Sequence, residues 1–252
     1  NPKLSDALKT YFKLKGKGKG EIFFRATRRA VRDVIALLKD RYLNDYSTTD
    51  AAQFRDHLLD RGLVSSTVKR VFAIIRAIIN LSIQEYGLTC KNAFARTYIP
   101  DLEDSIKRQP IPIDIIREIQ KECMKIDDPN RWLIALISDT GMRLSEALGL
   151  KVSDIKLDED IPYVNLIPNS ARRLKTKSSE RQIPLIGSSL WAAKQICSNV
   201  KDEFAFPHYT VKDYCHTNSA SAALNKWLKT KTIKNFVIHS FRHSMRDRLR
   251  AI

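Results

Sequence analysis

Three short segments in the second half of the chain carry residues suited to chemistry at a phosphate group. They are Thr140-Gly-Met-Arg143, the basic turn Lys175-Thr-Lys177, and His239-Ser-Phe-Arg242. A guanidinium donates paired hydrogen bonds to non-bridging phosphate oxygens, and two of them can neutralise a phosphorane-like transition state. A lysine whose pKa is lowered by burial and neighbouring arginines can protonate the leaving oxygen. Opening a phosphodiester without a metal ion or other cofactor would require residues of these types, so the three segments are candidates for phosphate chemistry.

Two spacings within these segments indicate how the side chains would be held. His239 precedes Arg242 by three residues, so on a helix both would face the same phosphate. Glu146 follows Arg143 by three residues and is a candidate to orient that arginine from behind, although a surface salt bridge would have the same spacing. His243 would face another side of the helix, so we leave it out of the predicted site.

Charge and composition limit the class of protein. The 252 residues include 44 Lys and Arg against 28 Asp and Glu, a net charge of +16 that favours a polyanionic partner such as nucleic acid. The four cysteines are scattered and form no Cys-x-x-Cys pair, so we expect neither disulfides nor a metal site. No apolar run is long enough to cross a bilayer and no targeting pattern opens the chain, which predicts a cytoplasmic protein with no membrane partner.

The first hundred residues read as a small helical bundle, residues 1–100. Apolar periodicity and capping residues predict helices over 4–14, 21–43, 47–62 and 65–87, with a glycine-rich basic loop at 15–20. Lys69, Arg70 and Arg76 lie largely off the apolar stripe of the last helix. They are candidate DNA contacts, although a solvated helix face would carry the same residues.

A proline-containing stretch, residues 101–112, has the composition of a linker and precedes a second domain at 113–252. Helices are predicted over 113–125, from a cap at Asp128 with Pro129 in the first turn, over 188–200 and 218–229, and from about 238 onward. Two strands, 163–167 and 182–185, flank a basic turn. The predicted fold class is mainly α with a small antiparallel β-hairpin, a helical bundle followed by an α+β domain.

In their order, separation and underlying elements, the three segments resemble the tyrosine recombinase, or phage integrase, family. The N-terminal bundle is similar, more loosely, to the core-binding domain of these enzymes. The resemblance implies that Arg143, His239 and Arg242 are catalytic and that Lys175 is the general acid. Lys177 remains the alternative general acid, because one sequence does not fix the register of a turn. The remaining candidate DNA contacts lie on the same turn and are Arg172, Arg173 and Lys177.

What the family does supplies the expected function. The resemblance implies a site-specific recombinase of mobile elements that binds double-stranded DNA, forms a 3′-phosphotyrosyl link, releases a 5′ hydroxyl, and assembles as a homo-tetramer on paired sites. Family members carry the tyrosine nucleophile beyond the His-x-x-Arg helix, whereas all eight tyrosines here precede Arg242 and the chain stops at Ile252. We assign none of them, and we expect a truncated chain that binds DNA without cleaving it.

Two other functions remain open at this point. A type IB topoisomerase would use similar chemistry as a monomer, although the compact Thr-Gly-Met-Arg turn argues against it. A non-enzymatic DNA-binding protein with a vestigial site would also fit, because no nucleophile is assigned. Replacing Arg143 by alanine separates a binder, which tolerates the change, from an enzyme, which does not.

Overall fold

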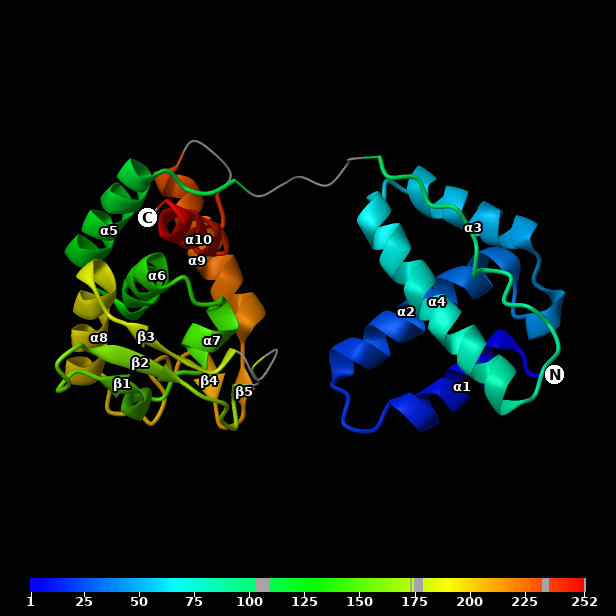
Figure 1. Cartoon of the computed structure of the whole chain (residues 1–252), viewed down its shortest axis with the longest axis horizontal. Helices are drawn as coiled ribbons and strands as arrows, with labels where there is room; N and C mark the ends of the chain where they lie inside the picture. The colour runs from blue at the N-terminus through cyan, green and yellow to red at the C-terminus, as the bar shows by residue number, and fades with distance from the viewer. Residues whose placement is uncertain (103–108, 173, 175–178, 233–235, 252) are drawn as a thin grey trace. The chain divides into compact units, whose positions relative to one another are not determined.

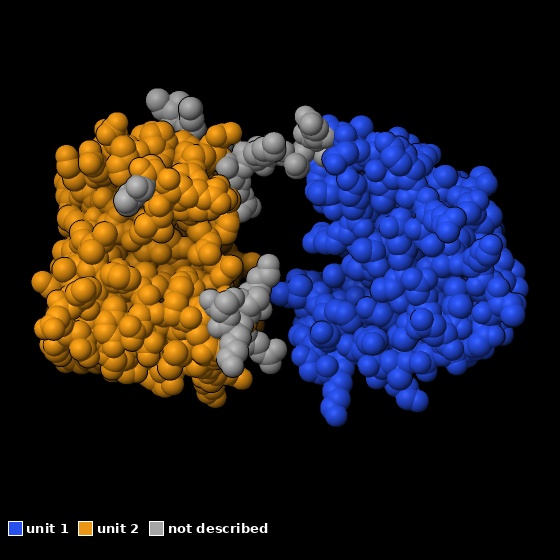
Figure 2. All heavy atoms as spheres, in the orientation of Figure 1, with its two compact units in different colours: residues 1–106 blue, residues 107–252 orange. Residues whose placement is uncertain are grey.

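A computed structural model describes residues 1–102, 109–172, 174, 179–232 and 236–251 (Figure 1). The chain divides into two compact units, Asn1–Ile106 and Lys107–Ile252 (Figure 2). The division falls inside the stretch 101–112, where the sequence predicts a linker. Each unit has its own cluster of buried hydrophobic side chains, so each is described by itself.

The described part of unit 1, which spans Asn1–Ile106, contains four α-helices. They are α1 (Leu4–Lys15), α2 (Glu21–Leu38), α3 (Thr48–Asp60) and α4 (Ser65–Glu85), with a short 3-10 turn, η1, at Leu43–Asp45. Three phenylalanines, Phe54, Phe72 and Phe94, are fully buried, and their ring centroids lie 5.7–6.3 Å apart. Aromatic packing at this spacing ties α3, α4 and the segment after α4 into one core.

Two boundaries in unit 1 differ from the prediction. The helix expected over 21–43 ends at Leu38, because Lys39 adopts a positive φ of 66° and the Tyr46 hydroxyl donates to the Lys39 carbonyl at 2.8 Å. Tyr42 is consequently not helical, and 48% of it is exposed. The helix predicted over 65–87 begins at Ser65 but ends at Glu85, and its N-cap, Val64, makes no side-chain capping hydrogen bond.

In unit 2, Lys107–Ile252, the residues that the structure describes form helices and two small antiparallel sheets. Its helices are α5 (Ile113–Ile126), α6 (Pro129–Thr140), α7 (Leu144–Leu148), α8 (Gly187–Asn199), α9 (Thr217–Lys231) and α10 (Ser240–Arg250), with a 3-10 turn, η2, at Val152–Asp154. One sheet has the order β1 (Ile155–Lys156), β2 (Tyr163–Leu166), β3 (Arg181–Pro184), and the other pairs β4 (Thr210–Val211) with β5 (Tyr214–Cys215). The mainly α fold class with a small antiparallel sheet is confirmed, whereas β1, β4 and β5 are not predicted.

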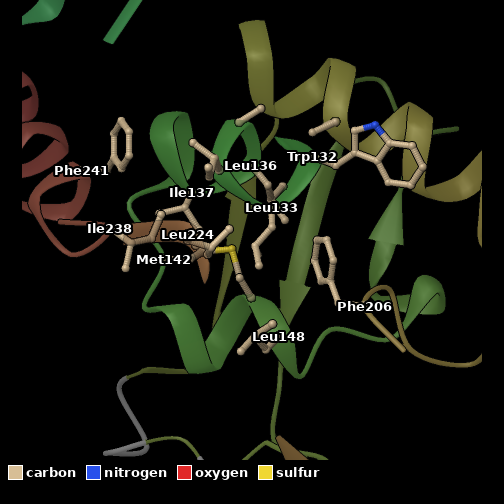
Figure 3. Close-up of a cluster of buried hydrophobic side chains, with 14 of the residues drawn as sticks. Trp132, Leu133, Leu136, Ile137, Met142, Leu148, Phe206, Leu224, Ile238 and Phe241 are labelled. Atoms are coloured by element: carbon tan, nitrogen blue, oxygen red, sulfur yellow. The ribbon is translucent and has the colours of Figure 1, made fainter. Parts of the chain in front are cut away.

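Helix α6 is the centre of unit 2. Every residue from Trp132 to Thr140 is buried, and the helix packs against α5, α8 and α10. Figure 3 shows Leu133, Leu136 and Ile137 of α6 in a cluster that includes Leu224 of α9 and Ile238 just before α10. Asp128 caps the helix by accepting from the Arg131 amide at 2.9 Å, as predicted. Because α6 is packed against these three helices, it holds the segment that follows its C-terminal residue, Thr140, in a fixed position.

No helix in the described part of the chain combines the length and the apolar character that crossing a membrane requires.

Candidate active site

The turn after α6 places Arg143 at the edge of the unit 2 core. Gly141 ends the helix in the left-handed conformation, φ 61°, and its amide donates to the Ile137 carbonyl at 2.9 Å. Met142 is then buried in the core, with 1% of its surface exposed, and Arg143 becomes the N-cap of α7. Because a buried residue precedes it and a helix follows it, the Arg143 backbone has little freedom, and its side chain emerges partly exposed, at 34%.

Glu146 fixes the side chain that Arg143 presents. Its carboxylate is 3% exposed and accepts from the Arg143 amide at 2.9 Å and from the Arg143 guanidinium at 2.5 Å. A second arginine, Arg181 at the start of β3, donates to the same carboxylate at 3.1 Å. Burial alone would raise the pKa of Glu146, but these hydrogen bonds outweigh it and lower the pKa below its ordinary value. Glu146 is therefore an ionised, buried carboxylate that orients the Arg143 side chain, and not the partner in a surface ion pair.

Arg242 lies against the same turn, approached from α10. Its guanidinium donates to the Gly141 carbonyl at 2.6 Å. Burial lowers the pKa of Arg242, and the positive charge of Arg143 lowers it further, with a smaller effect of Arg181. An arginine stays ionised even so, which means that unit 2 holds like charges close together in a partly desolvated place. An anion bound between Arg143 and Arg242 would relieve that repulsion, and a phosphodiester has the charge and the oxygens to do so.

His239 is the residue immediately before α10, and it is half-buried. Its carbonyl accepts from the Arg242 amide at 3.2 Å, and the neighbouring Phe241 is fully buried, which anchors the first turn of the helix. The His239 and His243 rings meet edge to face, with centroids 5.1 Å apart. Sequence spacing places His239 and Arg242 in the same turn correctly, but it does not show the contact with His243.

The predicted lysines are not placed. Lys175, Lys177 and Arg173 lie outside the described residues. The described structure includes the two strands that precede and follow them in the sequence, β2 and β3, which pair from Tyr163 with Pro184 to Leu166 with Arg181.

Arg172, predicted to contact DNA, is in the interior. Its side chain is 1% exposed and is paired with Asp154 at 3.0 Å, and its Nε donates to the Ile167 carbonyl at 2.8 Å. A guanidinium enclosed in this way does not reach DNA, so the prediction is corrected to a structural role. The basic composition of residues 172–181 misled the sequence argument, because composition does not separate a buried ion pair from a surface charge. The Arg172–Asp154 pair fastens the base of the hairpin to η2.

In unit 1, the predicted basic residues of α4 divide by environment. Lys69 and Arg70 are exposed, with Lys69 paired to Asp101 at 3.3 Å. Arg76 is partly buried, and its guanidinium donates to the carbonyls of Phe94 at 2.7 Å and Thr97 at 3.1 Å. Arg76 therefore holds the segment after α4 in place, and the structure does not support it as a DNA contact.

Arg70 belongs to a larger feature that we call the arginine groove, about 810 Å³ in volume and lined mainly by α2 and α4. The arginines that line it are Arg25, Arg28, Arg29, Arg32, Arg61 and Arg70. Asp33, also in the lining, lies within 4.0 Å of three of them. The four α2 arginines follow the i, i+3, i+4, i+7 spacing of one helix face, a pattern that is visible in the sequence although none of the four is among the predicted DNA contacts.

Among the described residues, no group of three or more His, Cys, Asp or Glu side chains is arranged to hold a metal ion.

Comparison with known proteins adds a family and several relatives. The model of the Phage integrase family matches residues 113–250. The transposase of transposon Tn916 from Enterococcus faecalis is 24% identical over 177 residues, which cover 65% of this chain and 42% of the transposase. The tyrosine recombinase XerC of Roseiflexus sp. (strain RS-1) is also 24% identical over 177 residues, covering 69% of this chain and 53% of that protein. The chain spans about half the length of these curated relatives.

The similarity to solved structures covers both units of the chain. The integrase of transposon Tn1549, in complex with a circular intermediate DNA, has a TM-score of 0.79 at 18% identity, covering 100% of this chain and 87% of that one. A lambda integrase tetramer bound to a Holliday junction has a TM-score of 0.76 at 16% identity, covering 98% of this chain and 73% of that one. At these identities the likeness establishes the fold.

Proposed function

This chain belongs to the phage integrase family, and from that premise we propose that it binds double-stranded DNA as part of a site-specific recombinase that breaks and rejoins strands through a tyrosine. The observation that carries the proposal is the pair Arg143 and Arg242, held at one turn by a buried carboxylate and a backbone carbonyl. Two fixed guanidinium groups suit the two non-bridging oxygens of a scissile phosphate.

The proposed chemistry is a transesterification. The tyrosine hydroxyl gives up its proton as its oxygen bonds to phosphorus, the bond from phosphorus to the 5′ oxygen breaks, and the leaving 5′ oxygen takes up a proton to become a hydroxyl. Arg143 and Arg242 bind the charge that develops on the phosphate, and His239 hydrogen bonds to the same group. Lys175 is the proposed proton donor, with Lys177 the alternative. The bond energy is kept in the 3′-phosphotyrosyl link, so religation needs no ATP.

We propose that the nucleophile comes from outside residues 1–252. Unit 2 contains Tyr163, Tyr209 and Tyr214. Tyr209 is buried and donates to the Asn130 side chain at 2.9 Å, and the other two lie in β2 and β5. Within the described part of the chain, none of the three is hydrogen bonded to an arginine of the site. By itself, residues 1–252 should then bind DNA without cleaving it.

The arginine groove is the proposed DNA-backbone contact of unit 1. Its arginines outnumber its single carboxylate, which favours attraction to phosphates and release of counterions. For the whole protein we propose assembly into a tetramer on paired sites, as in the lambda integrase structure bound to a Holliday junction.

The test uses the full-length protein that carries this chain. Incubated with end-labelled duplex from its own genomic surroundings, it should give protein-linked DNA that survives detergent. Arg143→Ala should lower the rate of adduct formation by about 10² to 10³, the usual effect of losing one donor to a transition-state oxyanion. Arg117→Ala is the matched control, because Arg117 is an exposed arginine of α5 that pairs with Asp114.

The outcomes separate the function classes. Unchanged adduct formation by Arg143→Ala would refute the proposed role of that arginine. Salt-sensitive binding without any adduct would make the protein a DNA-binding module and not an enzyme.

A further inference from the structure

Arg181 is the first residue of β3, and with Leu166 it forms the end pair of the β2–β3 ladder. Its guanidinium reaches two places: Nη1 donates to the Ser179 carbonyl at 2.8 Å, and Nη2 donates to Glu146 Oε2 at 3.1 Å. The first bond holds the end of the hairpin connection, and the second crosses to the helix after the Arg143 turn. Arg181 therefore links β3 to the element that carries Arg143.

Glu146 divides its two oxygens between the two arginines. Oε1 accepts from the Arg143 guanidinium, while Oε2 accepts from the Arg143 amide and from Arg181. A carboxylate that is 3% exposed has almost no water to complete its hydrogen bonding, so each donor it keeps is needed to hold it ionised and in place. Without Arg181, the carboxylate loses a charge-assisted bond on Oε2 and is held by the amide and the guanidinium of Arg143 alone.

The electrostatics are consistent with one shared cluster. Burial has the largest effect on the pKa of Arg242 and lowers it. The charges of Arg143 and Arg181 lower this pKa further, and the charge of Glu146 raises it. Three guanidinium groups and one carboxylate give the cluster a net charge of +2. Neither Arg143 nor Arg181 is enclosed, with side chains 34% and 31% exposed. Such a cluster suits an anion that gains negative charge in its transition state, provided that the geometry of Arg143 is fixed.

We propose that Arg181 is a positioning residue for the strand-transfer reaction: it acts through Glu146 to hold the Arg143 guanidinium and so links strand β3 to the arginine turn. This inference rests on the proposed function. Arg181 does not itself contact the phosphate in this account. Removing it should therefore slow the chemical step and leave DNA affinity almost unchanged.

The experiment measures adduct formation and DNA affinity separately in the full-length protein. Arg181→Ala should reduce the first-order rate of adduct formation at saturating DNA by about 10-fold to 100-fold, as loss of an outer-shell partner does at metal sites. The Kd for the same duplex should change less than about twofold. Arg181→Lys keeps a charge near Glu146 and should recover part of the rate, whereas Arg181→Gln should not. Arg117→Ala again serves as the control.

A double-mutant cycle decides between action through Glu146 and direct action. If Arg181 works through the carboxylate, Glu146→Gln and the double variant with Arg181→Ala should be equally slow. Multiplying effects would overturn the proposal, because Arg181 would then act on the phosphate independently. A normal rate for Arg181→Ala, with Arg143→Ala still inactive, would overturn this inference and leave the proposed function standing. Normal rates for both would refute the proposed function itself.

Discussion

Replacing Gly141 by alanine should displace helix α10. That displacement should both destabilise unit 2 and slow the reaction, because α10 carries Arg242. Gly141 has a φ of 61°, and a Cβ built on it would lie 2.9 Å from Met245 Cγ and 3.0 Å from Met245 Cβ. Met245 follows Arg242 by three residues on α10, and Arg242 donates to the Gly141 carbonyl. A methyl group at this position therefore pushes on the helix that brings the second arginine to the turn.

The magnitude follows from two separate costs. An L-residue in the left-handed conformation costs about 1–2 kcal/mol. An inserted methyl group in a packed place costs roughly 1–3 kcal/mol more, because the Met245 Cβ is attached to the helix backbone and does not swing away. The reduced entropy of the unfolded alanine chain returns about 0.4–1 kcal/mol. Gly141→Ala should thus lower the free energy of unfolding by about 1–5 kcal/mol.

Tryptophan fluorescence in a denaturant titration measures this effect in unit 2 alone, because all three tryptophans, Trp132, Trp191 and Trp227, lie there. In a Met245→Gly background, which removes both the Cγ and the Cβ that the new methyl group would meet, the steric part should vanish. Only the left-handed backbone cost less the entropy return should then remain, roughly 0–1.6 kcal/mol for Gly141→Ala. An equal cost in both backgrounds would refute the steric argument. Adduct formation by the full-length Gly141→Ala variant should fall at least about tenfold, because small misplacements of a catalytic group are costly.

Three further predictions concern the buried charges and the groove. Asp154→Asn should lower the free energy of unfolding of unit 2 by about 3–5 kcal/mol, because the buried Arg172 guanidinium loses its charged partner. The control Asp158→Asn, at an exposed position, should have little effect. Folding lowers the pKa of Glu146, so its ionised form stabilises the fold fully above the ordinary glutamate pKa and less as the pH falls through the folded pKa. The difference in unfolding free energy between wild type and Glu146→Gln should therefore shrink below roughly pH 4. A constant difference down to roughly pH 3 would contradict this. Arg70→Ala should reduce the slope of log K against log salt for DNA binding by residues 1–252 by about 1, and an unchanged slope would remove Arg70 from the interface.

Local signals predicted most of the helices, because capping and apolar period are properties of short segments. Asp128 caps α6 as predicted, and Ser47, the first residue of the helix predicted over 47–62, caps α3. The error at 39–43 arose because the apolar period continues to Tyr42, while the turn that ends α2 depends on Tyr46 bonding to the Lys39 carbonyl. The strands β1, β4 and β5 are two residues each, too short to show alternation.

At the site, sequence spacing predicted the pairing of Glu146 with Arg143, because the two are three residues apart on one helical turn. It did not predict Arg181, which reaches the same carboxylate from 35 residues further along the chain. Nor did it predict that Arg172 is buried, since a run of basic residues has the same composition inside or outside the fold. Contacts between distant segments are decided by tertiary packing, which a single sequence does not display.

The most direct test of the central claim identifies the chemical linkage. The full-length protein is incubated, with a chelator present, with duplex labelled either at its 5′ or at its 3′ end, and the ends of the broken strand are analysed. We predict that the 5′-labelled piece is attached to the protein through a 3′-phosphotyrosine, that the other piece carries a free 5′ hydroxyl, and that Arg143→Ala forms neither. Attachment through a 5′ phosphate, or a break that needs a metal ion and leaves no adduct, would contradict the account.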